Sequence, residues 1–456
     1  MRRNVLAALA ASAALLAAAG CGEESATSPT VVPSRSESST SSLAAEVRSL
    51  AAGRGIGPLT RPAPVRPELV HLGQALAFDK ILSGNRDIAC MTCHLPSFGT
   101  GDGLRLSIGA GGTGLGPSRT HTNSAFVIPR NAPPAFNLFA LDELFWDGRV
   151  AGDAQGGLLT PAGQRLNPNM TSAFEFGALS AQPMFPVLSR EEMRGMSGNE
   201  LAALSDKQAQ QIWKGLMDRL GRVREYRRMF EAAYPGKPFA EMNFAYASNA
   251  MAGFFVDQVS FNDSPWDRFL AGDDNAMTEP QLRGAKGFMS ARCSICHNGP
   301  AFTDNRFHNV AVAQFGPGRG DGPGGNDDFG RGHETGRPED RYAFRTPPLR
   351  NVELTAPYGH DGAFTDLREF VAHYSESDVR LRNFDASTLG PEFSGTLLHN
   401  FNEILATRDP LLDGVVFDDQ TIDDVTEFMK ALTDPAALDL SRLVPSTVPS
   451  GLSIDH

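Results

Sequence analysis

The sequence predicts a mostly α-helical protein in which two lobes are joined by long irregular loops. Apolar residues recur at helical spacing in several segments, whereas the sustained apolar–polar alternation that marks strands is scarce. The 46 glycines and 31 prolines among 456 residues favour long connections between the helices. One short cysteine motif occurs twice, about two hundred residues apart, which predicts one lobe for each copy.

The charge and the cysteine count exclude two classes of protein. The net charge is −12, from 41 basic and 53 acidic residues, and no basic block follows the first residues. A nucleic-acid-binding protein would need a cationic face, so no nucleic-acid partner is expected. Five cysteines are too few for a disulfide scaffold in a chain of this length.

Residues 1–20 have the pattern of a signal peptide. A charged Met-Arg-Arg start is followed by an apolar run that is too short to span a membrane. Small residues stand directly before Cys21, as at the cleavage sites of bacterial lipoproteins, so lipidation of Cys21 is expected. A plain signal peptide cut near Gly20 is the alternative. Both interpretations export the chain to the periplasm or cell envelope, and the only membrane contact expected is the lipid anchor.

Residues 21–60 are predicted to form a disordered tether. Within them, residues 25–42 contain eight serines and three threonines among eighteen positions, with almost no apolar residues. Such a stretch cannot bury enough apolar surface to fold. The folded body is therefore expected to begin near residue 60.

Four segments of the body carry helix signals, either an apolar face or a capping box. In chain order they are Pro67–Phe78, the boxes at Ser205–Gln208 and Thr278–Gln281, and Thr421–Asp424, which opens a last helix. Two Gly-rich segments, residues 109–116 and 316–332, are predicted to be irregular. Residues 318–332 match no EF-hand spacing and are expected to form a solvated loop.

The repeated motif is Cys-x-x-Cys-His, and it is the strongest chemical signal in the chain. Two thiols three residues apart can form thioethers with the two vinyl groups of one haem, and the adjacent histidine can then ligate the iron. The two copies are Cys90-Met-Thr-Cys93-His94 and Cys293-Ser-Ile-Cys296-His297.

Zinc binding and redox disulfides are the alternatives for such cysteine pairs. Two distant pairs that are each followed by histidine, in a chain expected to be exported, fit two covalently bound c-type haems better. The motifs then divide the body into two cytochrome c-like haem lobes, residues 61–255 and residues 256–456.

Several further strings resemble the bacterial di-haem cytochrome c peroxidases and their MauG branch, in order, from about residue 68 to residue 435. They are Leu72-Gly-Gln-Ala-Leu-Ala-Phe-Asp79, Leu82-Ser-Gly-Asn85, Arg130-Asn-Ala-Pro133, Phe145-Trp-Asp-Gly-Arg149, Asp263-Ser-Pro-Trp-Asp-Arg268, Leu349-Arg-Asn-Val352 and Thr355-Ala-Pro-Tyr-Gly-His-Asp-Gly362. The resemblance implies that hydrogen peroxide reacts at the N-terminal haem on His94. The C-terminal haem on His297 would store or relay electrons.

The resemblance also implies roles for three residues outside the motifs. Trp146 matches a tryptophan that lies between the two haems, although simple core packing is the alternative. Gln182 and Glu192 match a glutamine and a glutamate beside the peroxide-binding iron, where a carboxylate moves protons between the two peroxide oxygens. Because Ser189–Glu192 is also a capping box, Glu192 could instead cap a helix, and Glu191 is then the other candidate.

The sixth iron ligands separate the two branches of the family. Ordinary peroxidases place a blocking histidine where this chain has Ala110, so the first haem is expected to be open, as in the MauG branch. His121, eleven residues on, is the alternative ligand. At the second haem the MauG branch has a tyrosine, which matches Tyr374 on a helical apolar face with Phe370. Core packing is the alternative for Tyr374, and the adjacent His373 is expected to point off that face.

The family binds one calcium ion between the lobes. Asn131 matches its side-chain ligand, and Thr355 and Pro357 match its backbone carbonyl ligands. An asparagine that only braces a turn is the alternative. His360 and Arg350 match positions near the second haem, without an assigned role.

The sequence therefore predicts an exported di-haem peroxidase of the MauG-like kind. Its partners would be hydrogen peroxide and either a small redox protein as electron donor or a protein substrate that it oxidises. Three alternatives remain: an ordinary cytochrome c peroxidase that needs reductive activation, a non-catalytic di-haem electron carrier, and a peroxide sensor.

Overall fold

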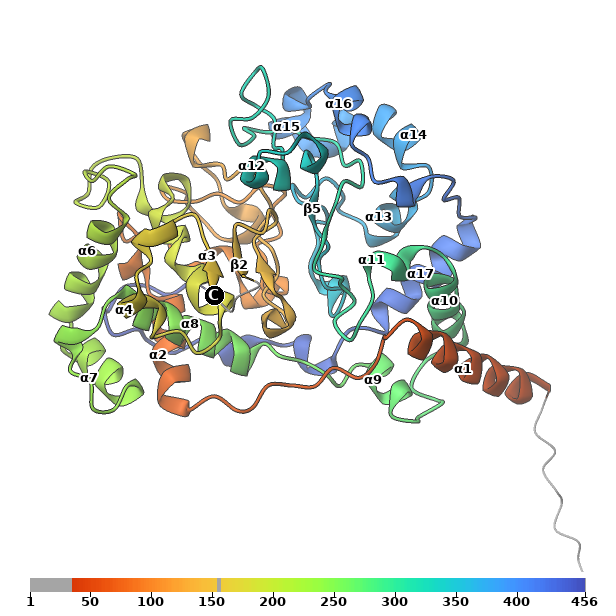
Figure 1. Ribbon diagram of the computed structural model, residues 1–456, viewed down its shortest axis with the longest axis horizontal. Helices are drawn as coiled ribbons and strands as arrows, with labels where there is room; N and C mark the ends of the chain where they lie inside the picture. Colours follow the sequence, from red (N-terminus) through yellow and green to blue (C-terminus); the bar gives the residue numbers. More distant parts are fainter. Residues whose placement is uncertain (1–34, 154–156, 456) are drawn as a thin grey trace, which may run out of the picture.

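The computed structural model describes residues 35–153 and 157–455. The predicted signal peptide, residues 1–20, and the predicted lipidation site Cys21 lie outside the described residues. The described chain is mostly helical and forms two lobes that lie side by side (Figure 1). The predicted fold class is confirmed. Within the described part of the chain, no helix is long and apolar enough to cross a membrane.

The first lobe is built around a close pair of helices, α2 and α8. A Cβ atom on Gly73 of α2 would lie 1.9 Å from the carbonyl oxygen of Ala250 in α8, so the two backbones touch. The buried faces of these helices continue into one apolar core. The helices of this lobe are α2 (Pro67–Phe78), α3 (Cys90–Cys93), α4 (Pro168–Thr171), α5 (Ala178–Ala181), α6 (Ala209–Arg222), α7 (Arg224–Ala233) and α8 (Phe244–Gln258).

The second lobe repeats this arrangement with α10 and α17. A Cβ on Gly284 of α10 would lie 1.8 Å from the carbonyl oxygen of Asp424 in α17. Trp266, Phe288 and Phe428 pack together beneath this contact. The helices of this lobe are α9 (Pro265–Leu270), α10 (Glu279–Ser290), α11 (Cys293–Cys296), α12 (Arg331–Thr335), α13 (Leu367–His373), α14 (Ser377–Arg382), α15 (Gly390–Phe393), α16 (Phe401–Ala406) and α17 (Asp419–Lys430).

Strands are few and short. One antiparallel sheet has the order β1–β2–β3, from β1 (Glu143–Leu144), β2 (Val150–Gly152) and β3 (Leu158–Leu159). A second pairs β4 (Phe307–His308) with β5 (Phe344–Arg345). The backbone N–H of Arg345 in β5 donates to the carbonyl of Trp146, so this small sheet also ties the second lobe to the first.

The two lobes exchange terminal segments. Helix α1 (Arg35–Gly53) lies against α10 of the second lobe, where Ala44, Val47 and Ala51 join the core. The prediction of a disordered tether over residues 21–60 is therefore wrong from residue 35 onward. This segment is helical because the few apolar residues after the serine-rich stretch share one helical face, which the second lobe covers.

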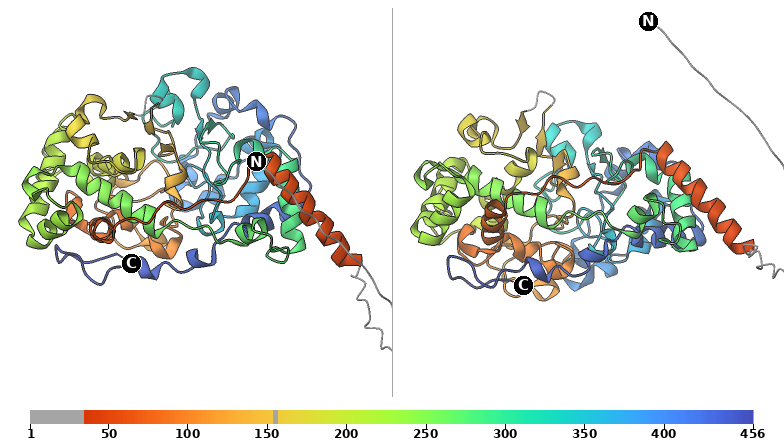
Figure 2. Two further views of the ribbon diagram at one scale, coloured as in Figure 1. Left: turned by 60° about the horizontal axis from the view of Figure 1, so that its bottom comes forward. Right: turned by 90° about the horizontal axis from the view of Figure 1, so that it is seen from below.

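The exchange is completed by a C-terminal tail, residues 434–455, which returns to the first lobe. Its Leu440, Leu443 and Val448 pack with residues of α2 and α8 in one buried cluster. The tail runs along the first lobe, at the opposite end of the molecule from α1 (Figure 2). Each lobe is thus completed by a segment that lies outside it in the sequence.

The capping boxes differ in outcome. Thr278 and Gln281 form the complete box, and α10 begins directly after Thr278, as predicted. At Ser205 only half the box forms: the backbone N–H donates to Gln208 Oε1 at 2.8 Å, and α6 begins later, at Ala209. The last helix begins at Asp419 rather than Thr421, because Asp418 accepts the N–H of Thr421 and caps it earlier.

Candidate active site

Both Cys-x-x-Cys-His motifs form a single helical turn whose cysteines face a cavity. The first cavity is lined by Cys90, Cys93 and His94, and the second cavity by the equivalent residues of the second motif, Cys293, Cys296 and His297. The two cavities share four lining residues, namely Asn131, Pro134, Trp146 and Arg345. The sites that the two motifs define are therefore separated by one shared wall.

The histidines of both motifs are oriented for metal ligation. Nδ1 of His94 donates to the carbonyl of Thr100 at 3.0 Å, and Nδ1 of His297 donates to that of Phe302 at 3.0 Å. These bonds leave each Nε2 free as the ligand atom. Burial lowers the pKa of His94, and it lowers that of His297 to about 4, so both rings are in the neutral, ligating form.

The cysteines fit thioether attachment rather than redox chemistry. Burial raises the pKa of Cys90 and of Cys293 to about 12, so both thiols are protonated and poor redox nucleophiles. Both cavities are walled mainly by apolar side chains, as a large planar porphyrin requires. The donor set and the cavity walls fit two haems.

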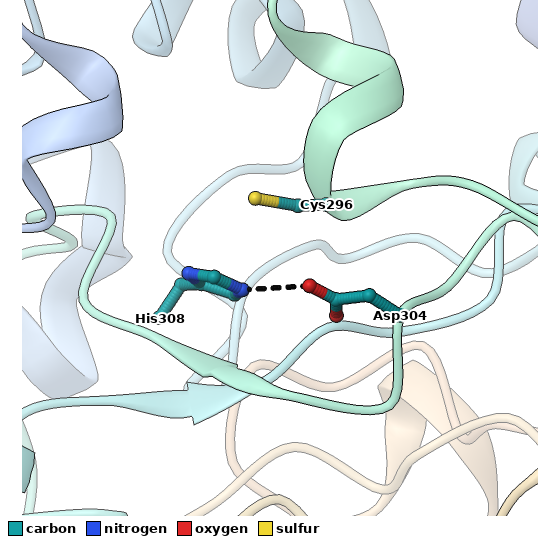
Figure 3. A group of neighbouring side chains, drawn as sticks. All are labelled: Cys296, Asp304 and His308. Atoms are coloured by element: carbon teal, nitrogen blue, oxygen red, sulfur yellow. Dashed lines mark hydrogen bonds and ion pairs between the residues drawn. The ribbon is translucent and has the colours of Figure 1, made fainter. Parts of the chain in front are cut away.

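Among the residues that the structure describes, one other group of side chains meets the geometry of a metal site: Cys296, Asp304 and His308 (Figure 3). Nε2 of His308 lies 3.0 Å from Asp304 Oδ2, and Nδ1 lies 2.5 Å from Asp409 Oδ2. Burial disfavours the charged ring, but the hydrogen bonds to the two carboxylates and the contact with Cys296 outweigh it and raise the pKa of His308 to about 11. This is an ion-paired imidazolium at the second cavity, and a thioether at Cys296 would remove the sulfur as a metal ligand.

Trp146 lies in the wall between the cavities. Its side chain is 8% exposed, and its indole N–H donates to the carbonyl of Asn131 at 2.9 Å. The next residue, Asp147, is fully buried between Arg130 and Arg149, with oxygen–nitrogen distances of 2.5 and 2.9 Å. The ion pairs fix the backbone that carries Trp146.

The carboxyl of Glu192 is not used in the hydrogen bonds of the turn that carries it. Glu192 lies in a short π-helical turn, Arg190–Arg194, that Ser189 caps by accepting the N–H of Glu192 at 3.2 Å. The Ser189 hydroxyl donates to Glu191, at 2.9 Å, and not to Glu192. Both glutamates line the first cavity together with Gln182, but Glu191 is exposed and bonded to Ser189, whereas Glu192 is half-buried. Both candidate proton-handling residues are thus on the same wall.

The environment of Glu192 sets its proton affinity. Burial raises the pKa of its carboxyl, and Arg149, Arg319 and Arg130 oppose that rise. Glu191 adds a smaller upward contribution. The result is a carboxyl with a pKa above its usual value, which suits a group that must both take and return a proton.

The loop at Ala110 packs directly on the turn that carries Glu192. The N–H of Ala110 donates to the carbonyls of Glu191 and Glu192 at 3.1 and 2.9 Å, and a Cβ on Gly109 would lie 1.8 Å from the Glu191 oxygen. Ala110 is buried and offers no side-chain ligand. His121 instead bonds to Glu392 at 2.9 Å. Of the described residues that line the first cavity, the one histidine is His94.

Tyr374 lines the second cavity with three residues of α13, namely Leu367, Phe370 and Val371. This is the predicted helical face. Burial raises the pKa of Tyr374, and its two next contributors are Cys296 and Cys293, which places the phenol beside the motif. His373 points away, as expected: its Nε2 donates to the carbonyl of Val310 at 2.8 Å, and its ring packs beside Phe364.

The three predicted calcium ligands, Asn131, Thr355 and Pro357, all line the second cavity. The side-chain nitrogen of Asn131 donates to the carbonyl of Leu104 at 2.7 Å. Its backbone N–H donates to the carbonyl of His360 at 2.9 Å, which holds it beside the Thr355–Pro357 segment.

The two residues without an assigned role occupy different places. His360 is buried, lines the second cavity and stacks on Phe344 with ring centroids 3.6 Å apart. Arg350 does not line either cavity. Its guanidinium donates to Asp267 and to the carbonyl of Pro300, so it fastens α9 within the second lobe.

Sequence reasoning missed two arginines of the first cavity. Arg345, which lines both cavities, is 4% exposed and donates only to the carbonyls of Phe145 and Thr346. Burial lowers its pKa to about 10. Arg319 lies in the segment that was expected to be a solvated loop; this expectation is wrong for residues 318–320, which line the first cavity. Neither arginine belongs to a periodic pattern that could have revealed it.

Two helical lobes that each present a Cys-x-x-Cys-His motif to a cavity define a di-haem c-type protein. A model of the family of di-haem cytochrome c peroxidases matches residues 67–275. Cytochrome c551 peroxidase of Pseudomonas aeruginosa is 31% identical over 314 residues, which are 68% of this chain and 73% of that protein. The methylamine utilization protein MauG of Methylorubrum extorquens is 29% identical over 70% of this chain and 71% of its own.

Solved structures agree with this grouping. A MauG-like protein associated with microbial copper homeostasis superposes with a TM-score of 0.59 and 25% identity, over 85% of this chain and 95% of the other. The di-haem peroxidase BthA of Burkholderia thailandensis shares the fold, with a TM-score of 0.57, 20% identity and coverage of 86% and 91%. The chain belongs to the di-haem cytochrome c peroxidase family. It is a peroxidase-type oxidoreductase with two c-type haems.

Proposed function

We propose that this protein is a MauG-like peroxidase that reacts with hydrogen peroxide at the first cavity while fully oxidised. The observation that carries the proposal is the composition of that cavity. It holds the proximal His94 and the carboxyl of Glu192, and no second histidine of the described residues lines it. When bound, the two haems supply the iron site for peroxide and the two electrons that its reduction consumes. The remaining steps belong to the chain's own residues.

Glu192 moves the protons in this proposal. Its carboxylate takes the proton from the peroxide oxygen nearer the iron site and returns it to the farther oxygen, which leaves as water. The pKa of Glu192, raised by burial, favours return of the proton. Gln182, on the same cavity wall, orients the peroxide through its amide.

Trp146 and Tyr374 serve the second site. Trp146 is the aromatic side chain in the shared wall and provides the route for electrons between the two cavities. Tyr374 would ligate the iron of the second haem through its phenolic oxygen; because burial raises its pKa, only a strong positive charge favours loss of the phenolic proton. Asn131, Thr355 and Pro357 hold one Ca²⁺ beside the wall.

The electrons come from a small redox protein or from a side chain of a protein substrate. Residues 1–20 direct export to the periplasm or cell envelope, and Cys21 carries the lipid anchor. The relatives include both a cytochrome c551 peroxidase and the methylamine utilization protein MauG.

The test is to add stoichiometric hydrogen peroxide to the fully oxidised holo-protein without reductant and to record the visible and near-infrared spectra. A prompt change is expected in both regions. A change that requires prior reduction of one haem would contradict an open first site and favour an ordinary peroxidase. No change in either state would favour an electron carrier.

A further inference from the structure

A segment of the second lobe closes the first cavity. Pro317, Gly318, Arg319 and Gly320 line the first cavity, although they lie between β4 and α12 of the second lobe. The lining of the cavity is therefore made by both lobes, and the second lobe contributes charge as well as shape.

The segment is held in place by its own hydrogen bonds. The N–H of Arg319 donates to the carbonyl of Asp327 at 2.9 Å, and the N–H of Asp327 donates to that of Asp321 at 3.1 Å. Gly318 has φ +61°, and a Cβ there would lie 1.9 Å from the carbonyl oxygen of Asn326. Asp321 also accepts the N–H of Phe329 at 2.9 Å. Arg319 thus stands at a fixed place on the cavity wall.

Charge counting singles out Arg319. Arg130 pairs with Asp328 and Asp147, and Arg149 pairs with the same Asp147, so these two arginines are balanced by two carboxylates. Among the described residues, Arg319 forms no ion pair within 4.0 Å. Burial, Arg130 and Arg149 lower its pKa, and the opposing effects of Asp147 and Asp328 are smaller; these carboxylates already pair with the other two arginines.

Apart from the already paired Asp147, Arg319 lowers the pKa of two carboxyls, Glu192 and Glu334, and of these Glu192 lines the same cavity as Arg319. Besides Arg319, the charged groups that face Glu192 are Arg149 and Arg130 on its cationic side and Glu191 on its own turn. Cys90 and Cys93, beneath it on α3, also sense its charge. Arg345 lines the same cavity from β5. Arg130 and Arg149 pair with Asp147 and Asp328, and Arg345 donates to two backbone carbonyls without acting on Glu192. Arg319 is therefore the second-lobe cation that both lines this cavity and lowers the pKa of Glu192.

We propose that Arg319 is a positioning residue for Glu192, and that it holds the Glu192 carboxylate ionised from across the boundary between the lobes. An ionised carboxylate is what the first proton transfer from peroxide requires. The proposal rests on the proposed function and adds to it a second-lobe residue on which peroxide reactivity depends. It also makes correct docking of the lobes a condition for that reactivity.

The test compares three holo-proteins that carry Arg319→Ala, Arg319→Lys or, as control, Arg337→Ala. Arg337 is an exposed arginine of the same lobe and lines neither cavity. The rate of the peroxide-induced spectral change is measured against pH by stopped flow. In Arg319→Ala the acid limb should move to higher pH by about one unit, because one opposite charge near a carboxyl is lost. Arg319→Lys should restore most of the shift, and Arg337→Ala should leave the profile of the unmodified protein unchanged.

A second readout needs no turnover. The C=O stretch of protonated Glu192, identified by its loss in Glu192→Gln, is titrated by infrared difference spectroscopy in the resting protein. The midpoint pH of this titration should rise in Arg319→Ala by the same amount as the acid limb of the rate profile. Haem content and circular dichroism confirm that each variant is folded and loaded.

Three results would overturn the inference. A rate lowered equally at every pH would mean that Arg319 only shapes the cavity. A changed haem midpoint potential with an unmoved pH profile would mean that Arg319 pairs with a haem propionate instead of Glu192. If the unmodified protein fails to react at any pH, the proposed function fails and the inference with it, an outcome that the variants alone cannot produce.

Discussion

At the scale of single residues, the position of Glu192 depends on which of two adjacent carboxylates satisfies a helix cap. Ser189 has one hydroxyl proton, and Glu191 accepts it at 2.9 Å. Half of the predicted capping box forms, because Ser189 accepts the backbone N–H of Glu192. The Ser189 backbone N–H donates to the carbonyl of Pro186, so the Glu192 carboxyl takes no part in the cap. The spacing of a capping box cannot show that Pro186 takes the backbone N–H that the Glu192 carboxyl would accept in the complete box.

Glu192→Gln keeps the size of the side chain but cannot accept a proton. We expect the rate of the peroxide-induced spectral change to fall by roughly 10²–10⁴-fold, the usual contribution of a positioned acid–base group. Stopped-flow spectroscopy on the oxidised holo-protein measures it. Glu191→Gln is the matched control and should retain most of the rate. Equal losses in both variants would mean that the cap, and not proton transfer, governs the reaction.

His308 gives a pH dependence of stability with a defined sign. Burial lowers the pKa of its ring, but hydrogen bonds to Asp304, Cys296 and Asp409 outweigh burial and raise it above the ordinary value of 6.5. With Cys296 in a thioether, the two carboxylates keep that direction, so the stabilisation is complete below pH 6.5 and declines as pH rises through the raised pKa. Thermal unfolding should show a Tm deficit for His308→Gln that is largest in mild acid and narrows at alkaline pH. The exposed His399→Gln should show no such trend; a pH-independent deficit would contradict the ion-pair account.

At the scale of elements, each lobe depends on a glycine at the point where two helices touch. The sequence pattern predicted α2 and α10 closely, because local propensity and proline in the first turn agree in both helices and α10 also has a complete capping box. It did not predict the partner of either helix. Nothing local to Gly73 or Gly284 shows that a backbone carbonyl of a distant helix lies within 2 Å of the missing Cβ.

Gly284→Ala tests this contact against a neighbour in the same helix. We expect Gly284→Ala to lower the free energy of unfolding by about 1–3 kcal/mol, because α10 and α17 must move apart. Gly287→Ala is the control, because its Cβ would meet Val425 at an ordinary 3.6 Å. Alanine lowers the conformational entropy of the unfolded chain, so less entropy is lost on folding, and this variant should be neutral or stabilised by up to about 1 kcal/mol. Denaturant unfolding of the holo-proteins measures both. Equal effects would show that the close approach is not the controlling contact.

At the scale of the whole molecule, the sequence indicated the contents of the sites better than their assembly. The two haem motifs, Trp146 and Glu192 lie in short strings whose chemistry is local, and the structure places them on two cavities. Arg319 and the tail carry no such string. Their importance arises from contacts between residues that lie far apart in the chain, and neither periodicity nor motif spacing encodes such contacts.

The tail offers a test of how strongly the exchanged segments bind. Asp455 accepts the hydroxyl of Thr92, inside the first haem motif, at 2.6 Å and pairs with Lys80 at 2.6 Å. Asp455→Ala should cost about 1–3 kcal/mol of unfolding free energy, since it leaves a buried hydroxyl without its acceptor. We also expect a larger fraction of protein lacking haem at Cys90 and Cys93 than at the second motif, measured by mass spectrometry of proteolytic peptides. Leu438→Ala, at an exposed tail position, is the control.

The bond between Asp455 and Thr92 also sets an order of events. In a chain made from its amino end, Cys90 and Cys93 are complete long before residues 434–455 exist. The tail residues that contact the first motif follow the whole second lobe in the chain. We expect haem attachment at the first motif to precede docking of the tail, whereas α1, which packs on α10 in the core that Cys293 joins, precedes the second motif in the chain.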